Sequence, residues 1–203
     1  MFRMVGKTYG GKMLDLDLVP KGSIVISAGL GEEISFDLEL LAHGCAIVGL
    51  DPTEKAMKFV EGQNLENFMF LPAALSHEPG PVTMYKNPNP KHVSESILPN
   101  HRSVSKESYM VGAYTIPELL EMHPNTSVIK MDVEGAEYEI IKSLTSLKVP
   151  QVVIEFHHFC SDYTLKDTHD MIARMKTLGY PYYVPKKSSE PLAEMTFVHE
   201  SCL

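Results

Sequence analysis

Three acidic side chains occur together at the end of one apolar segment, and their types and spacing are suited to chemistry. Asp132, Glu134 and Glu137 lie where an apolar run that starts at Ser127 changes to a helical pattern. Three like charges in so short a segment repel one another, so the arrangement is costly unless a cation, a hydrogen-bond donor or solvent offsets it. Carboxylates in such a position can bind a cation or accept a proton from a reacting group.

A second apolar segment ends in residues of the same kind. The predicted strand Gln151–Phe156 contains Glu155 and is followed by His157 and His158. In an open α/β sheet the carboxyl ends of the parallel strands meet at the edge where ligands bind. Asp132, Glu155 and His157 would offer carboxylate oxygens and an imidazole there, a donor set that suits Mg²⁺ or Mn²⁺. Hydrogen bonding among the same three groups is the alternative.

A glycine turn earlier in the chain predicts a nucleoside-binding site. The apolar strand Ser23–Ala28 breaks at Gly29, Leu30 and Gly31, and a helical pattern follows. Glycines let the backbone approach a ligand closely, and the helix start presents unpaired N–H groups. The next strand delivers Asp51 at its end, where an acid can accept both hydroxyls of a ribose. An acid about 20 residues beyond the glycines, in one β-α-β unit, is a nucleoside-binding pattern.

The remaining hydrophobic patterns continue an alternation of strands and helices. Further strands are predicted at Cys45–Leu50, Asn67–Leu75, Val82–Tyr85, Tyr180–Val184 and Met195–His199, and helices at 34–41, 116–122, 140–147 and 172–178. The first of these helices is expected to turn Ile34, Leu38 and Leu41 toward the core and to end at Gly44. We therefore expect a single doubly wound α/β domain over residues 1–203.

Two segments lie outside this alternation. Residues 1–22 are predicted to form a hairpin or a lead-in strand around the turn at Tyr9. Residues 87–112 show little periodicity, and a loop of this length in a compact domain is more often a lid or binding segment than coil. The basic or imidazole side chains near this loop are Lys86, Lys91, His92, His101, Arg102 and Lys106. They predict an acceptor that carries a carboxylate or phosphate, with a solvated loop as the alternative.

The bulk properties exclude several classes of partner. The chain has 203 residues and a net charge of −8, which argues against binding to duplex nucleic acid through phosphate contacts. The odd count of three cysteines, without metal-type spacing, predicts reduced thiols. The sequence has no apolar signal segment and no run long enough to cross a membrane. We expect a soluble, cytoplasmic protein.

Four segments together resemble the FkbM family of S-adenosylmethionine-dependent methyltransferases. They are Ile24–Gly31, Gly49–Pro52, Ile129–Glu137 and Val153–His157, of which the stretch from Lys130 to Glu137 is the most specific to the family. The resemblance extends from about Tyr9 to the last strand. It implies the class I methyltransferase fold, a Rossmann-like three-layer sandwich whose mostly parallel seven-stranded sheet ends in an antiparallel C-terminal hairpin. It also implies O-methylation of a hydroxyl on a small molecule or sugar.

The resemblance also implies roles for individual residues. Gly29 and Gly31 would pass under the methionine and ribose of the cofactor, and Asp51 would take the ribose diol. Many relatives have an acid where this chain has Ser27, so the amino group of the cofactor would be contacted from elsewhere. The expected cofactor-binding residues are Tyr9, Gly29, Gly31, Glu32, Asp51, Ala73, Ala74 and Asp132.

Methyl transfer to a hydroxyl requires a base within hydrogen-bond reach of the acceptor. His157 and Asp132 are the candidates for this base, and Glu134 and Glu155 would hold them or the substrate. A nicotinamide-dependent oxidoreductase is a competing interpretation, although Ile34 stands where the third glycine of a dinucleotide site would be. A non-catalytic nucleoside-binding protein is another.

Overall fold

A seven-stranded sheet crosses the computed structural model, which describes residues 1–203 except 8, 90 and 188–191. Its strands lie in the order β11-β12-β10-β9-β3-β4-β5. Their bounds are β3 (Ile24–Ala28), β4 (Ala46–Leu50), β5 (Phe68–Leu71), β9 (Thr126–Met131), β10 (Gln151–Glu155), β11 (Tyr182–Pro185) and β12 (Glu194–Val198). Neighbouring strands from β10 to β5 pair in parallel, whereas β12 is antiparallel to both β10 and β11. The predicted class I methyltransferase fold is confirmed.

Two layers cover the faces of this sheet. The helices are α1 (Ser35–His43), α2 (Glu54–Glu61), α3 (Ile116–Met122), α4 (Glu137–Ser143) and α5 (Leu165–Thr177), with short 3-10 helices η1 (Leu16–Leu18) and η2 (Glu200–Cys202). The largest apolar cluster packs α3, α4 and α5 against one face of the sheet. A second cluster packs α1 and the hairpin of β1 (Phe2–Val5) and β2 (Lys12–Asp15) against the other face. Each fully buried aliphatic or aromatic side chain stabilises this sandwich by about 1.5–3 kcal/mol.

The buried face of α1 agrees with the prediction in part. Ile34 is buried and Leu41 packs against the second apolar cluster, as predicted, whereas Leu38 is exposed. Phe36 and Leu40 supply the rest of the buried face. Ile34 precedes the first turn, so the helix begins one residue later than predicted. The predicted end is confirmed, because Gly44 adopts a left-handed conformation with φ of 104° and its N–H bonds the carbonyls of Leu40 and Leu41.

A second, three-stranded sheet contains part of the segment predicted to be a loop. It has the order β6-β8-β7, with β6 (Ala74–Leu75), β7 (Gly80–Tyr85) and β8 (Ser108–Tyr114). Residues 108–112 therefore belong to a strand, and the predicted strand Asn67–Leu75 is divided between two sheets. β8 is exposed along one side, which left its sequence without the apolar run of a buried strand.

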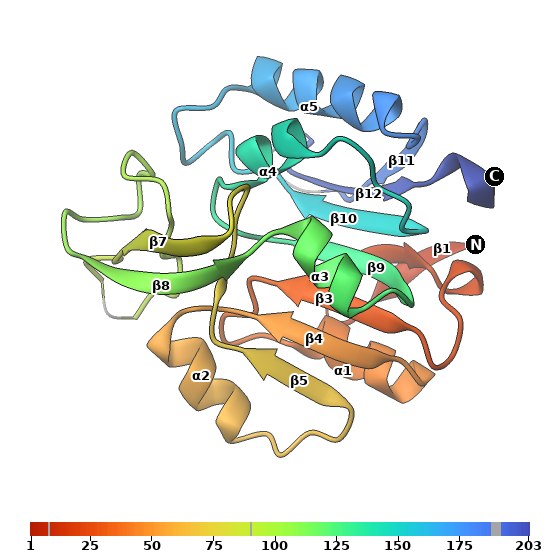
Figure 1. Ribbon diagram of the computed structural model, residues 1–203, viewed down its shortest axis with the longest axis horizontal. Coiled ribbons are helices and arrows are strands. Elements are labelled where there is room, and N and C mark those ends of the chain that lie inside the picture. The colour runs from red at the N-terminus through yellow and green to blue at the C-terminus, as the bar shows by residue number, and fades with distance from the viewer. Residues whose placement is uncertain (8, 90, 188–191) are drawn as a thin grey trace.

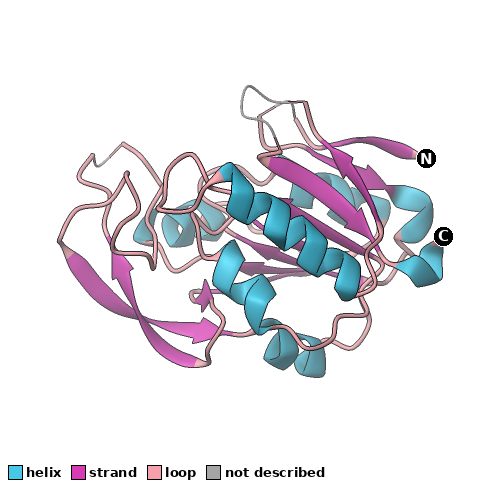
Figure 2. Cartoon of the chain, turned by 90° about the horizontal axis from the view of Figure 1, so that it is seen from above, coloured by secondary structure: helices cyan, strands magenta, loops and turns pink. Residues whose placement is uncertain are grey.

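The small sheet stands at one end of the molecule, and both termini lie at the other (Figures 1 and 2). The segment from 86 to 107 joins β7 to β8 at this end, where the predicted site lies. In the part of the chain that the structure describes, no helix is both long and apolar enough to traverse a bilayer.

Candidate active site

A cavity of about 310 Å³ opens at the carboxyl ends of the parallel strands. It lies between the glycine turn after β3, the ends of β4, β9 and β10, and the segment that follows β7. The structure brings all of the residues predicted for the site to its wall: Tyr9, Gly29, Gly31, Glu32, Asp51, Ala73, Ala74, Asp132, Glu134, Glu155 and His157. Other residues that line the cavity, among them Met84, Val93 and Ile97, were not predicted from the sequence.

The glycine turn is packed directly against the segment that follows β9. Gly29 has φ of 78°, a conformation that L side chains rarely adopt, and a Cβ added there would lie 1.7 Å from the carbonyl oxygen of Asp132. Lys130 donates from its Nζ to the carbonyls of Ala28 and Gly29, at 3.3 and 2.5 Å. Only glycine fits at position 29, and the turn is therefore held in one shape.

Asp51 holds the same turn from its other side. One carboxylate oxygen accepts the N–H groups of Leu30 and Gly31 at 3.0 and 2.9 Å. The other accepts the N–H and the hydroxyl of Thr53 at 2.9 and 2.6 Å. A carboxylate offers about four acceptor positions, so all of them are used within the protein. In this structure Asp51 shapes the turn, and its binding of a ribose diol stays a prediction.

Six charged side chains form an ionic cluster at the other end of the cavity: Lys12, Lys130, Lys186, Asp132, Glu155 and Glu194. Lys12 is only 3 % exposed, and its Nζ lies 2.9 Å from Glu155 Oε2 and 2.7 Å from Glu194 Oε2. Lys186 bonds the same oxygen of Glu194 at 3.2 Å. Lys12, Lys186 and Glu194 were not predicted from the sequence. The one available signal was the alternation of β2, which places Lys12 on the same buried face as Leu14.

Asp132 and Glu155 have pKa values shifted in opposite directions. Burial acts to raise the pKa of Asp132, but Lys130, Lys12 and His157 outweigh it and lower the pKa to about 2. Burial and the charge of Asp132 raise the pKa of Glu155, with Lys12 opposing them. Two acidic groups whose environments separate their pKa values in this way are typical of sites that divide acid and base roles.

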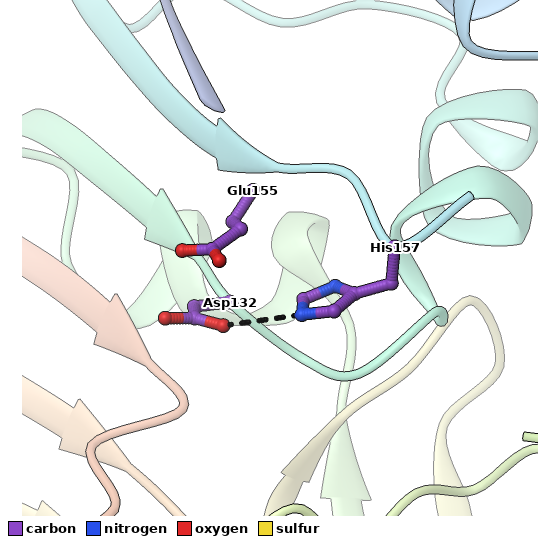
Figure 3. A group of neighbouring side chains, drawn as sticks. All are labelled: Asp132, Glu155 and His157. Atoms are coloured by element: carbon purple, nitrogen blue, oxygen red, sulfur yellow. Dashed lines mark ion pairs between the residues drawn. The ribbon is translucent and has the colours of Figure 1, made fainter. Parts of the chain in front are cut away.

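His157 is held as a cation by the carboxylates around it. Its Nε2 lies 3.7 Å from Asp132 (Figure 3). The same nitrogen lies 3.6 Å from Glu134, and Nδ1 lies 2.8 Å from Oε1 of the buried Glu137. Burial alone would lower the pKa of His157, but Glu137, Glu134 and Asp132 raise it to about 10. An imidazole that keeps its proton at neutral pH cannot act as a general base, which corrects the role predicted for His157. It can donate a hydrogen bond.

This ion pair predicts a loss of stability at alkaline pH. Because folding raises the pKa of His157 from 6.5 to about 10, the stabilisation from its proton is complete below pH 6.5 and is lost progressively toward pH 10. Urea unfolding of the wild type and of His157→Gln across this window measures it. We expect the difference in free energy of unfolding, on the order of a few kcal/mol near neutral pH, to shrink as the pH rises. A difference independent of pH would contradict a buried imidazolium.

The predicted metal ligands, Asp132, Glu155 and His157, lie close together. One ligand atom from each lies within 4.8 Å of the others, and the three side chains point toward one another (Figure 3). The ammonium of Lys12 approaches two of the three, at 2.9 Å from Glu155 and 3.7 Å from Asp132. The convergence predicted from the sequence is therefore present, together with a cation that the sequence did not predict.

The segment from 86 to 107 turns its apolar and acidic residues toward the cavity. Val93, Ser94, Glu95 and Ile97 line it, whereas none of the basic residues of this segment does. Lys86 lies over the ring of Tyr109, and the Arg102 side chain donates to the carbonyl of Phe159.

Glu134 anchors this segment over the site. The hydroxyl of Ser96 donates to the Glu134 carbonyl at 2.6 Å, and His101 Nε2 lies 3.3 Å from the Glu134 carboxylate. Glu134 has φ of 51° and is followed by Gly135 with φ of 100°, so the chain turns sharply between β9 and α4. The Glu134 side chain is therefore shared between the loop and His157.

A family model described as the methyltransferase FkbM domain matches residues 28–182 of the sequence. The chain belongs to the FkbM methyltransferase family. This FkbM match contains the glycine turn, Asp51, Asp132, Glu155 and His157. Three members of the ionic cluster, Lys12, Lys186 and Glu194, lie outside the matched range. A search of curated proteins gave no significant match.

The FkbM chain is also similar to solved methyltransferase structures. The sequence identities are so low that the similarity shows the fold alone. Magnesium protoporphyrin IX methyltransferase from Synechocystis PCC 6803, with bound SAM, is 11% identical with a TM-score of 0.46, covering 89% of this chain and 71% of that chain. A TehB-like SAM-dependent methyltransferase from Corynebacterium glutamicum is 13% identical with a TM-score of 0.46, covering 90% and 83%. An rRNA methylase from Streptococcus thermophilus is 12% identical with a TM-score of 0.45, covering 89% and 87%.

Proposed function

We propose that this FkbM protein transfers a methyl group from S-adenosylmethionine to a hydroxyl of a small molecule or sugar. The observation that carries the proposal is that one cavity joins a rigid glycine turn to a pair of carboxylates with separated pKa values. The turn is suited to a nucleoside, and the carboxylates are suited to an acceptor hydroxyl.

The cavity fits this cofactor in its size and in its lining. About 310 Å³ is within the usual range for small-molecule sites. Pro52, Ala73, Ala74 and Leu75 offer an apolar surface for a flat base, and the acidic side chains of the cavity attract a sulfonium. Asp132 has no nitrogen donor within 3.5 Å among the described residues, since its three cationic neighbours lie 3.7–3.8 Å away. Its carboxylate therefore remains available to an ammonium or hydroxyl of a ligand.

Bound S-adenosylmethionine would supply a methyl group whose carbon an oxygen nucleophile can attack, with the demethylated cofactor as the leaving group. Glu155 accepts the proton of the acceptor hydroxyl, because its pKa is raised and Lys12 holds only one of its two oxygens. His157 donates toward Asp132 and Glu134 and keeps both carboxylates in place. Correct alignment of the reacting groups can contribute as much as about 7–11 kcal/mol to the acceleration.

The charges that line the cavity favour an uncharged acceptor. The described residues of its wall include eight carboxylates, at Glu32, Glu33, Asp51, Glu95, Asp132, Glu134, Glu155 and Glu194, and four cationic groups, at Lys12, Lys130, Lys186 and His157. An anionic acceptor was predicted from basic residues of the 86–107 segment, and these lie away from the cavity. A neutral polyol avoids the repulsion that a carboxylate or phosphate would meet here.

Calorimetric titration with S-adenosylmethionine and with its demethylated product tests the cofactor, and NAD provides the comparison. We expect both sulfur nucleosides to bind and NAD not to bind. Incubation with the labelled cofactor and matched neutral and phosphorylated sugars then tests the acceptor. Absence of heat with either sulfur nucleoside, or label on the phosphorylated sugars alone, would contradict the proposal.

A further inference from the structure

The ionic cluster contains a buried cation, Lys12, whose only role in the proposed reaction so far is to hold one oxygen of Glu155. Asp132, Glu155 and Glu194 carry three negative charges, and Lys12, Lys130 and Lys186 carry three positive charges that lie within 4.0 Å of them. The cluster is thus balanced without any added ion. Lys12 is the member that contacts all three carboxylates.

We propose that Lys12 is the built-in counter-cation of the carboxylate cluster, and that its ammonium occupies the place where a divalent metal would otherwise bind. Lys12 is a positioning residue that acts through Glu155 and Asp132. Methyl transfer at this site then requires no metal, a consequence that rests on the proposed function. The occupation of the cation position by Lys12 does not depend on that function.

The hairpin that carries Lys12 is fixed to the main sheet at several points. Lys12 pairs with Val5 across the hairpin, and Leu14, on the same face of β2, is fully buried in the second apolar cluster. Gln151 of β10 exchanges two hydrogen bonds with the backbone of Asp15, both at 2.9 Å. The hydroxyl of Thr196 on β12 donates to the carbonyl of Met13. These contacts deliver the ammonium to one position beside β10 and β12.

The same position has the donor set of a divalent-cation site. One carboxylate oxygen of Asp132 and one of Glu155 lie within 4.8 Å of each other. Glu194, which is 5 % exposed, adds a carboxylate whose Oε1 has no hydrogen-bond partner among the described residues. A divalent ion bound to Glu155 Oε2 would displace or repel the ammonium that lies 2.9 Å from that oxygen. Removal of the ammonium would leave hard oxygen ligands with an uncompensated charge, which favours Mn²⁺ or Mg²⁺.

Binding of Mn²⁺, followed by electron paramagnetic resonance, tests this assignment in the full chain. At a Mn²⁺ concentration that saturates Lys12→Met we expect no detectable binding to the wild type, a difference in affinity of about tenfold or more, because the variant lacks the competing charge. Lys12→Arg retains the charge and is expected to bind no Mn²⁺. Combining Lys12→Met with Glu155→Gln should abolish the gained binding. Thermal unfolding with and without Mn²⁺ is the second measurement, and we expect the metal to raise the midpoint of Lys12→Met only.

Each result of the Mn²⁺ measurements supports or overturns the role assigned to Lys12. Mn²⁺ binding by the wild type that is lost in Glu155→Gln overturns the proposal, as does binding by Lys12→Arg or its absence from a folded Lys12→Met. If Lys12→Met folds only when Mn²⁺ is added, the metal has replaced the ammonium and the proposal is supported. Titration of the wild type with S-adenosylmethionine, without metal and with a chelator, separates the two ideas. Absence of cofactor binding both with and without the chelator contradicts the proposed function and leaves the Mn²⁺ result intact, whereas binding that is lost only with the chelator overturns the proposal for Lys12.

Discussion

Gly29→Ala is expected to abolish binding of S-adenosylmethionine and to destabilise the protein strongly. The added methyl group would lie 1.7 Å from the Asp132 carbonyl, so the turn and the end of β9 must move apart. Overpacking of this kind and the left-handed backbone together cost on the order of 3 kcal/mol or more. Calorimetry with the cofactor and urea unfolding measure the two effects.

Gly22→Ala is the matched control for this substitution. Gly22 has nearly the same backbone conformation, with φ of 79°, but a Cβ there would meet no atom within 4 Å. The control therefore carries the strain of a left-handed residue, about 1–2 kcal/mol, without the clash. We expect it to retain cofactor binding. Equal effects of the two variants would show that the close approach of Gly29 to Asp132 is not what shapes the site.

Glu155→Gln is expected to reduce methyl transfer by about 10²–10⁴-fold while binding of the cofactor changes little. Glutamine has the same shape as glutamate but cannot take up the proton of the acceptor hydroxyl. Since the pKa of Glu155 is raised, activity of the wild type should fall as the pH decreases through a value above the ordinary 4.5, because the base becomes protonated. Single-turnover rates of both proteins between about pH 5 and pH 8 measure this.

Glu194→Gln is the matched control for Glu155→Gln. Glu194 shares Lys12 with Glu155, at 2.7 Å, so its substitution disturbs the charge balance of the cluster in a similar way without removing the proposed base. We expect a loss of about tenfold or less and an unchanged pH profile. If both variants lose activity equally, the cluster acts through its charge alone and Glu155 is not the base.

The features that the sequence predicted correctly are governed by local patterns. The glycine turn, the acid after β4 and the strand that ends at Met131 each follow from a few neighbouring residues. The parallel strands are buried on both sides and therefore appear as continuous apolar runs. Because parallel strands align their carboxyl ends, the meeting of Asp132, Glu155 and His157 was predictable before any distance was known.

The features that the sequence did not predict depend on distant contacts. The role of Lys12 comes from Glu155 and Glu194, and no local pattern connects these residues. His157 was expected to be a base because nothing near it in the sequence indicates the buried Glu137 beside its Nδ1. The buried face of α1 is likewise set by its packing against the β1–β2 hairpin and the sheet, which placed Leu38 outside.

The contacts of Lys12 also determine when the ionic cluster can form during synthesis of the chain. Lys12 leaves the ribosome before its partners, because Glu155 follows it by 143 residues and Glu194 by 182. Until these residues are synthesised, the hairpin carries an ammonium without its carboxylate partners. Pairings over such separations are slow to form, because a long loop must close first. The ionic cluster is therefore complete only after β12 has been synthesised and has paired with β10.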